Sequence, residues 1–266
     1  MIAFVIPVKP KFNSKDWGND NALLSRTLKS ICNQTNSGFL VYVVYHDLPE
    51  LTFDHPNIKF IQYPFSYLNS DSIEDLEDYA LKYYSRKYAE YMFDKGKKIT
   101  FGCDKAKRDG CNFIMAVDSD DLVSNKIAKF VNSSSASKPG WVIEKGYIYL
   151  ENSKFLIKSK LLQGINGSTH IINSNLVPIP DLETNRLFDF NFFESHGYLR
   201  TRIQQLYNMN LETLPFYGAI YIVHKFNSSA ISDLVTKFKI KTYLKYLIFG
   251  KLLDSKTREE FSLYNV

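Results

Sequence analysis

The run of residues 113–117 constrains the fold more than any other stretch of the chain. Five apolar or small residues (FIMAV) stand together there, and the polar sequence DSDD follows at once at 118–121. An apolar run of this length predicts a strand buried on both faces, as in a parallel sheet. The acids then lie at the carboxyl end of that strand, where open α/β sheets bind their ligands.

Two interpretations of the acids stay open on the sequence alone. Asp118, Asp120 and Asp121 place three carboxylates within four residues, so a positive partner is expected beside them. A divalent cation carrying a phosphorylated ligand would suit them. Asp and Ser are also common after strands because they form turns and cap helices, and Asp121 before Leu122 fits that plainer reading.

The composition predicts a folded protein with a substantial core. The chain has 266 residues, of which 45% are hydrophobic and 23% are charged, which excludes intrinsic disorder. The net charge of +5 gives weak support to an anionic partner such as a nucleotide or a membrane surface; no nucleic-acid partner is predicted. The three cysteines show no metal-binding spacing, so a reduced, cytoplasmic chain is the simplest expectation.

The N-terminus reads as a first strand. MIAFVIPVKP lacks the basic start and long apolar core of a signal peptide, and no apolar run approaches the ~18 residues of a membrane span. Strands are expected at Ile2–Ile6, Phe39–Tyr45 and Ile58–Tyr63, with a helix over Asn21–Asn33 between the first two. Strand, helix and strand in this order imply a parallel unit.

Further elements are expected along the rest of the chain. A long helix should open at Asp71, with Glu74 as its capping-box acid, and a basic helix should lead to Gly110. The second half predicts a hairpin of Trp141–Ile143 with Tyr147–Leu150, extended segments at 155–157 and 168–172, a helix over Glu194–Leu206 and a last strand over Gly218–Val223.

The C-terminal stretch 232–266 combines an apolar stripe with lysines. The stripe and the basic residues around it include Ile240, Tyr243, Leu244, Lys241 and Lys245. The pattern fits an amphipathic helix docked on the body of the protein. It also fits an interfacial helix on an anionic membrane, which would place the protein at the inner face of the membrane.

Taken together, three stretches resemble a glycosyltransferase of the GT-A fold, closest to the family 2 type. They are the opening FVIPVK with LLSRTLKSICNQT, the strand and Asp-x-Asp motif FIMAVDSDD, and YIVHKFNSS at 221–229. The resemblance implies a Rossmann-like, mostly parallel α/β sheet flanked by helices. It further implies a nucleotide-sugar-binding half at 1–125, an acceptor-binding half of the same domain at 126–231, and the tail at 232–266.

The resemblance also implies a metal-dependent transfer, most simply inverting, from a nucleotide-sugar to a bacterial-type glycan or lipid-linked acceptor. Mn²⁺ or Mg²⁺ would neutralise the departing diphosphate. By resemblance, the metal ligands are Asp118, Asp120 and His224, and Asp118 also serves the donor. The other predicted donor-binding residues are Pro7, Val8, Lys9, His46, Asp47, Ser119 and Lys98. Lys98 belongs to a basic segment upstream of the acids, which could reach a diphosphate or could form a solvated helix face.

A general base must deprotonate the acceptor hydroxyl in an inverting transfer. The family carries acids at the head of a helix in its second half, and the matching stretch here is FFESHGYLRTR. Glu194 is the predicted base, with Asp189 as a competitor, although Ser195 stands where the second acid of the family pattern would be. Trp141, Gly167, Ser168 and His196 are expected to border the acceptor.

Two other function classes fit part of the pattern. Asp118-Ser119-Asp120 after a strand also matches the nucleophile motif of haloacid dehalogenase-like phosphatases, although that family places the motif on its first strand. A non-catalytic glycan-binding module on the same fold would bind nucleotide with metal and turn over no acceptor.

Overall fold

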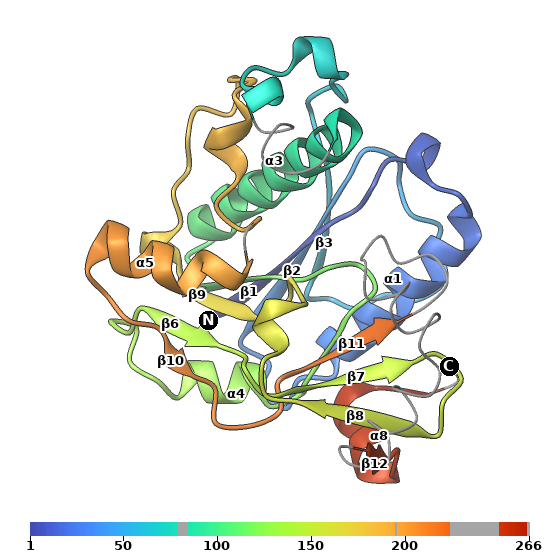
Figure 1. The fold of residues 1–266 in the computed structure, drawn as a ribbon. Coiled ribbons are helices and arrows are strands. Elements are labelled where there is room, and N and C mark those ends of the chain that lie inside the picture. The colour runs from blue at the N-terminus through green and yellow to red at the C-terminus, as the bar shows by residue number, and fades with distance from the viewer. Residues whose placement is uncertain (79–84, 195, 224–249, 265–266) are drawn as a thin grey trace.

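The computed structural model describes residues 1–78, 85–194, 196–223 and 250–264. His224 and the segment with the predicted apolar stripe, up to residue 249, lie outside these ranges. Twelve strands are named in the described chain, and they form two sheets. Figure 1 shows the larger sheet in the middle of the molecule and the smaller one beside the C-terminal elements.

The larger sheet has seven strands and is mostly parallel. Its order is β10-β6-β9-β4-β1-β2-β3, and β9 is the strand that runs against its neighbours β4 and β6. The strands are β1 (Ile2–Pro7), β2 (Phe39–Tyr45), β3 (Ile58–Gln62), β4 (Phe113–Ala116), β6 (Gly140–Val142), β9 (His170–Asn173) and β10 (Glu212–Thr213). This mostly parallel sheet, flanked by helices, confirms the predicted α/β fold class.

The apolar strands are buried because helices cover both faces of this sheet. Successive residues of β1 alternate between two cores: Phe4 packs with Leu24 and Leu28, and Val5 packs with Ile99 and Cys103. The first core contains α1 (Trp17–Cys32) and α4 (Ile127–Asn132), and the second contains α3 (Arg86–Arg108) and α5 (Leu199–Tyr207). A strand covered on both faces must be apolar throughout, as the sequence indicated.

The smaller sheet has five strands in the order β12-β8-β7-β11-β5. They are β5 (Leu122–Val123), β7 (Gly146–Leu150), β8 (Phe155–Ser159), β11 (Ala219–Val223) and β12 (Gly250–Leu252), followed by the helix α8 (Ser255–Phe261). Because β5 follows the acids of 118–121 directly, the acid loop passes from one sheet to the other.

The hairpin predicted between Trp141–Ile143 and Tyr147–Leu150 is wrong, although both strands exist. β6 pairs with β9 and β10 in the larger sheet, whereas β7 pairs with β8 and β11 in the smaller one. Gly146 is needed for close packing and not for a turn. A Cβ there would lie 2.6 Å from the carbonyl oxygen of Ala219.

The long helix begins later than its acidic residues suggested. Asp71 lies in a short 3-10 helix, η2 (Ser70–Ser72), and Glu74 pairs with Arg186 in an isolated bridge. Asp75 then adopts a left-handed φ of 60°, which interrupts a regular helix. Helical residues follow at 76–78, and α3 begins after Ser85, whose hydroxyl accepts a hydrogen bond from the backbone N–H of Tyr88, a typical N-cap.

The helix predicted over Glu194–Leu206 is also shorter than expected. The backbone N–H groups of Glu194 and His196 bond to nearby carbonyls in turns, so α5 begins only at Leu199. The remaining 3-10 helices are η1 (Lys11–Asn13), η3 (Leu162–Gly164), η4 (Ser174–Leu176), η5 (Leu187–Phe190) and η6 (His196–Tyr198).

Close packing of α3 on the sheet requires a glycine at position 102. A Cβ on Gly102 would lie 2.4 Å from Cγ1 of Val5 and 3.1 Å from Cγ2 of Val44. This contact fixes the height of α3 above β1 and β2, and thereby the position of every side chain that α3 directs toward the sheet.

We predict that Gly102→Ala lowers the free energy of unfolding by up to about 2 kcal/mol, because an overpacking cost of ~1–3 kcal/mol is offset by only ~1 kcal/mol gained in helix propensity. Gly18→Ala in α1 is the matched control, since its Cβ would have 3.6 Å of room. Urea denaturation of both variants is the measurement, and equal stabilities would contradict the packing account.

Candidate functional site

The acid loop begins where β4 ends, in the middle of the larger sheet. The backbone N–H of Val117 still bonds to the carbonyl of Val5 at 2.9 Å, and the next N–H, that of Asp118, donates to Oγ of Ser168 at 2.8 Å. The predicted acids are therefore at the carboxyl end of the strand, between β1 and the antiparallel β9.

Asp121 has a structural role within this loop. Its Oδ2 accepts hydrogen bonds from Nδ2 of Asn166 at 2.8 Å and from Oγ of Ser168 at 2.5 Å. Burial, with the nearby charges of Asp120 and Asp118, raises its pKa well above the ordinary value. Asp121 is therefore structural, as the plainer interpretation expected, but it caps no helix, because the strand at Leu122–Val123 follows it. Asp118 and Asp120 stay partly exposed.

Lys95 of α3 is the cation that meets the acids. Its Nζ lies 2.6 Å from Oδ1 of Asp118. Burial alone would lower the pKa of Lys95, but Asp118, with smaller contributions from Tyr91 and Asp120, outweighs burial and raises that pKa. The positive partner expected from the sequence is therefore supplied, at least in part, by the chain itself.

Lys98 was predicted to bind the donor, and the structure places it in the core instead. Its side chain is 0% exposed, and its Nζ donates to the carbonyl of Val8 at 2.7 Å and to Asp94 at 2.8 Å. Burial lowers the pKa of Lys98 despite Asp94. In this position it supports the end of β1 and has no surface to offer a diphosphate.

The other predicted donor residues lie at the carboxyl ends of β1 and β2, except Ser119, which lies in the acid loop after β4. Lys9 pairs with Asp20 at 2.8 Å, and Oδ2 of Asp47 accepts from the backbone N–H of Lys11 at 2.7 Å. The ring of His46 packs edge-on against Tyr63. Pro7 ends β1 beside Val44, and Ser119 accepts a hydrogen bond from Thr27 through its carbonyl.

Arg26 of α1 is a second cation near the acids, which sequence reasoning did not identify. Its pKa is lowered by burial, against the opposing charges of Glu151 and Asp120. Its Nη1 lies 3.6 Å from Glu151, and within the described chain its Nε and Nη2 have no hydrogen-bond partner.

Glu194 and His196 are the residues predicted to serve the acceptor as base and contact. Of these two, His196 lies close enough to Lys95 and Asp118 for their charges to act on it. Burial and then Lys95 lower the pKa of His196, while Asp118 opposes them. Burial raises the pKa of Glu194 to about 7, and Arg202 opposes that shift. A carboxyl group with this pKa is suited to accept a proton near neutral pH, but its electrostatic partner is Arg202 and not the acid loop.

The predicted acceptor residues divide into two groups. Gly167 and Ser168 lie against the acid loop, since a Cβ on Gly167 would be 3.1 Å from Oδ2 of Asp118. Ser168 is fully buried and holds the loop. Trp141 is 1% exposed in the core against Phe113 and Phe130, so its side chain has no surface for an acceptor.

Two of the three predicted metal ligands, Asp118 and Asp120, lie within the described residues, and both are carboxylates. Asp118 and Asp120 are hard oxygen ligands of the kind that Mg²⁺ and Mn²⁺ prefer. Among the residues that the structure describes, no group of three His, Cys, Asp or Glu side chains could hold a metal ion, and the third predicted ligand, His224, is outside them. Two carboxylates still fit, because Mg²⁺ commonly combines one or two with substrate phosphates and water.

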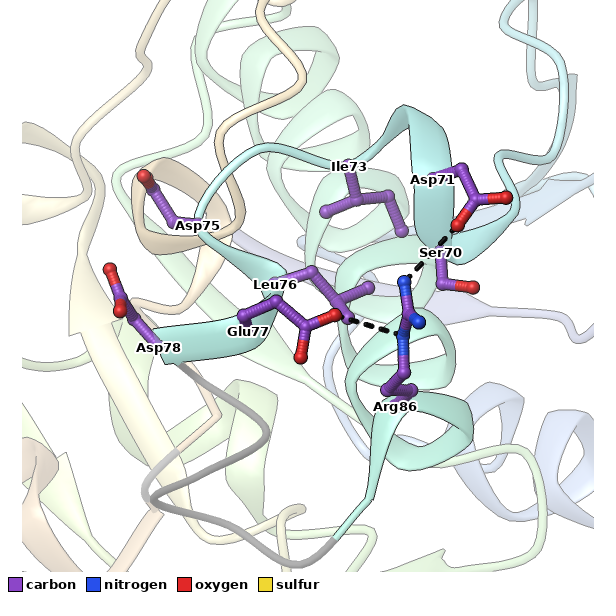
Figure 2. Close-up of a pocket in the computed structure, with 8 residues that line it drawn as sticks. All are labelled: Ser70, Asp71, Ile73, Asp75, Leu76, Glu77, Asp78 and Arg86. Atoms are coloured by element: carbon purple, nitrogen blue, oxygen red, sulfur yellow. Dashed lines mark hydrogen bonds and ion pairs between the residues drawn. The ribbon is translucent and has the colours of Figure 1, made fainter.

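A hollow of about 460 Å³ lies elsewhere, near the start of α3. Figure 2 shows its lining residues, with Arg86 bonded to Asp71 and Glu77. Arg86 is nine residues before Lys95, or about 13.5 Å along the helix. The hollow holds none of the predicted site residues. We assign the functional site to the acid loop because two partly buried cations, Lys95 and Arg26, and groups with shifted pKa values gather there.

No protein-family model matches this chain, and no curated protein matches it significantly. Among solved structures, it is similar to TarS of S. aureus in complex with UDP-GlcNAc, at 11% identity and a TM-score of 0.45, over 97% of this chain and 69% of that one. It is also similar to an active-site mutant of LgtC, at 12% identity and a TM-score of 0.37, over 97% and 100% of the two chains. At these values the functional proposal must rest on the residues of the site.

We predict that Lys98→Met lowers the free energy of unfolding by about 3–5 kcal/mol, because it removes the hydrogen-bonded cation beside the buried Asp94 and leaves that carboxylate with only His46, whose Nδ1 lies 3.7 Å away. Lys59→Met is the matched control, since Lys59 pairs with Asp109 at 2.7 Å near the surface and such pairs contribute at most about 1 kcal/mol. Denaturation with urea tests both. If both variants lost the same free energy of unfolding and Lys98→Met also bound nucleotide more weakly, Lys98 would have to be assigned to the donor site.

We predict a pH-dependent stability difference between the wild type and Glu194→Gln. Because the folded-state pKa of Glu194 is raised from 4.5 to about 7, the folded protein retains a proton that the unfolded chain releases. The free energy of unfolding of the wild type should therefore fall relative to the variant as the pH rises from about 4.5 to about 7, and then stay level. Parallel melting curves across this window would contradict the raised pKa.

Proposed function

We propose that this protein transfers a sugar from a nucleotide-sugar donor to a glycan or lipid-linked acceptor, as a GT-A type glycosyltransferase. The observation that carries the proposal is the acid pair Asp118 and Asp120 at the carboxyl end of a central parallel strand. The buried Asp121, bonded to Asn166 and Ser168, holds the loop that carries the pair, and Lys95 meets Asp118 from α3. Such a site is suited to an anionic ligand that brings its own cation.

A divalent metal, Mn²⁺ or Mg²⁺, would be held by Asp118 and Asp120, with His224 as the proposed third ligand. When bound, it would supply positive charge to the departing diphosphate. The chain's own contribution is to hold the carboxylates in place, which the hydrogen bonds of Ser168 to the backbone of Asp118 and to the side chain of Asp121 achieve.

The acceptor is proposed to enter on the side of His196 and Glu194. Glu194 is kept as the general base because a pKa of about 7 lets it take a proton from a hydroxyl group at neutral pH. His196, which shares the electrostatic surroundings of Asp118 and Lys95, is placed to contact the acceptor near the donor. An inverting outcome remains part of the proposal.

Contact with a membrane also remains a proposal. None of the helices in the described ranges is long and apolar enough to cross a membrane. The predicted apolar stripe lies outside those ranges, so the cytoplasmic placement and the peripheral contact rest on the sequence pattern.

We predict that Asp120→Asn lowers the rate of nucleotide-sugar hydrolysis by about 100-fold or more, because the variant loses charge where the leaving group is stabilised. Hydrolysis without an acceptor is the assay, since it needs only the donor: UDP-, GDP- and dTDP-sugars are supplied with Mn²⁺, and release of nucleoside diphosphate is measured. EDTA should abolish the release.

Asp71→Asn is the matched control, because Asp71 is an exposed acid in the hollow of Figure 2. Its rate should equal that of the wild type. Full activity of a folded Asp120→Asn protein, or loss of activity in Asp71→Asn alone, would contradict the assignment of the site. Release of phosphate from an aryl phosphate would instead favour a phosphatase.

A further inference from the structure

The contact between Lys95 and Asp118 occupies one of the two carboxylates proposed to hold a metal. Nζ of Lys95 lies 2.6 Å from Oδ1 of Asp118, and the two side chains are 20% and 30% exposed. The pair is therefore neither a freely solvated surface contact nor sealed in the core. Water and ions can reach it, and both groups can exchange partners.

The helix α3 directs a stripe of side chains from this pair into the core. Tyr91, Lys95, Lys98 and Gly102 follow one another at helical spacing, so they lie on one face. Gly102 packs on Val5 and Lys98 bonds to Val8 at the end of β1, which leaves Lys95 just beyond the strand ends. Tyr91 and Asp120 lie close enough to Lys95 to influence its charge.

We propose that Lys95 is an exchangeable counter-ion, which neutralises Asp118 until a divalent cation arrives and then binds the diphosphate of the donor. This inference rests on the proposed function. An ammonium and a divalent cation repel each other and compete for the same carboxylate, so the ion must displace Lys95. A lysine has a flexible four-carbon stem and three donors, and the nearest new anion is the diphosphate that accompanies the ion.

The net charge of the site before and after the donor and the divalent cation bind supports this exchange. A nucleotide-sugar diphosphate carries two negative charges, which a divalent cation cancels, so donor and ion together bring no net charge into the site. Lys95 therefore remains needed in both states, first beside Asp118 and then beside the diphosphate. A lysine serves this purpose better than an arginine, because its ammonium is a compact point charge that does not bind a carboxylate in a fixed bidentate geometry.

The first test measures Mn²⁺ alone, without nucleotide, by the electron paramagnetic resonance signal of the free ion. Lys95→Met should bind Mn²⁺ at least about tenfold more tightly than the wild type, because an opposing charge within ~4–6 Å changes such affinities by one or more powers of ten. Lys59→Met is the control and should bind like the wild type. Unchanged or weaker binding by Lys95→Met would overturn the counter-ion role.

The second test measures UDP, GDP and dTDP at saturating Mn²⁺ by calorimetry. Lys95→Met should bind the nucleotide that the wild type selects about tenfold or more weakly, and an unchanged affinity would overturn the diphosphate contact. Lys95→Gln, which keeps a polar side chain, provides a second variant if Lys95→Met does not fold. Circular dichroism checks the fold of each.

The two tests separate this inference from the proposed function. If the wild type binds none of the nucleotides, the proposed function fails and the diphosphate contact fails with it. The Mn²⁺ titration still decides whether Lys95 occupies the cation position, since that measurement requires no nucleotide and no turnover.

Discussion

Like charges crowded at the end of one buried strand are the constraint on which the site depends. Asp118, Asp120 and Asp121 follow β4 within four residues, and three ionised carboxylates at that spacing would repel one another strongly. The fold relieves this repulsion in two ways. Burial and the charges of Asp120 and Asp118 raise the pKa of Asp121, against the hydrogen bonds from Ser168 and Asn166, and the ammonium of Lys95 lies directly against Asp118.

The helix α3 connects this electrostatic arrangement to the core. Its contact with β1 through Gly102 fixes its height, and the buried pair of Lys98 with Asp94 anchors it to the end of the same strand. One further turn toward the start of the helix brings Lys95 to Asp118. Lys95 and Lys98 are three residues apart, about 4.5 Å along the helix, yet one lies in the site and the other in the core.

The positions of the strands could be predicted from the sequence better than the pairing between them. The apolar runs of β1, β2 and β4 identified the parallel strands because strands covered on both faces must be apolar throughout. The hairpin at residues 141–150 was wrong because strand pairing depends on the whole sheet, and Gly146 serves close packing against Ala219. The helix start predicted at Asp71 was wrong because the backbone of Glu74 pairs with that of Arg186 and Asp75 adopts a left-handed φ of 60°.

The same limit applies to the site. The acids were found because their chemistry and position are local, and the need for a positive partner was predicted from their charge. Which lysine supplies it could not be predicted, because Lys95, Lys97 and Lys98 lie within four residues of one another and their surroundings depend on how α3 packs on the sheet. Lys95, Lys98 and Gly102 are spaced by three and four residues and so lie on one face of a helix, whereas Lys97 does not fit that spacing. This signal could have separated Lys97 from the other two lysines. Arg26 gave no signal, since its proximity to Asp120 depends on how α1 packs.

The most direct measurement of the central claim is a thermal-shift panel of UDP, GDP, CMP and dTDP, each with Mn²⁺ and with EDTA. Ligands that bind only the folded state raise its melting temperature. The account predicts a rise for one nucleotide that requires the metal and is lost in EDTA. The absence of a rise with every nucleotide would contradict it and would leave the acid loop as a structural turn or a phosphatase site.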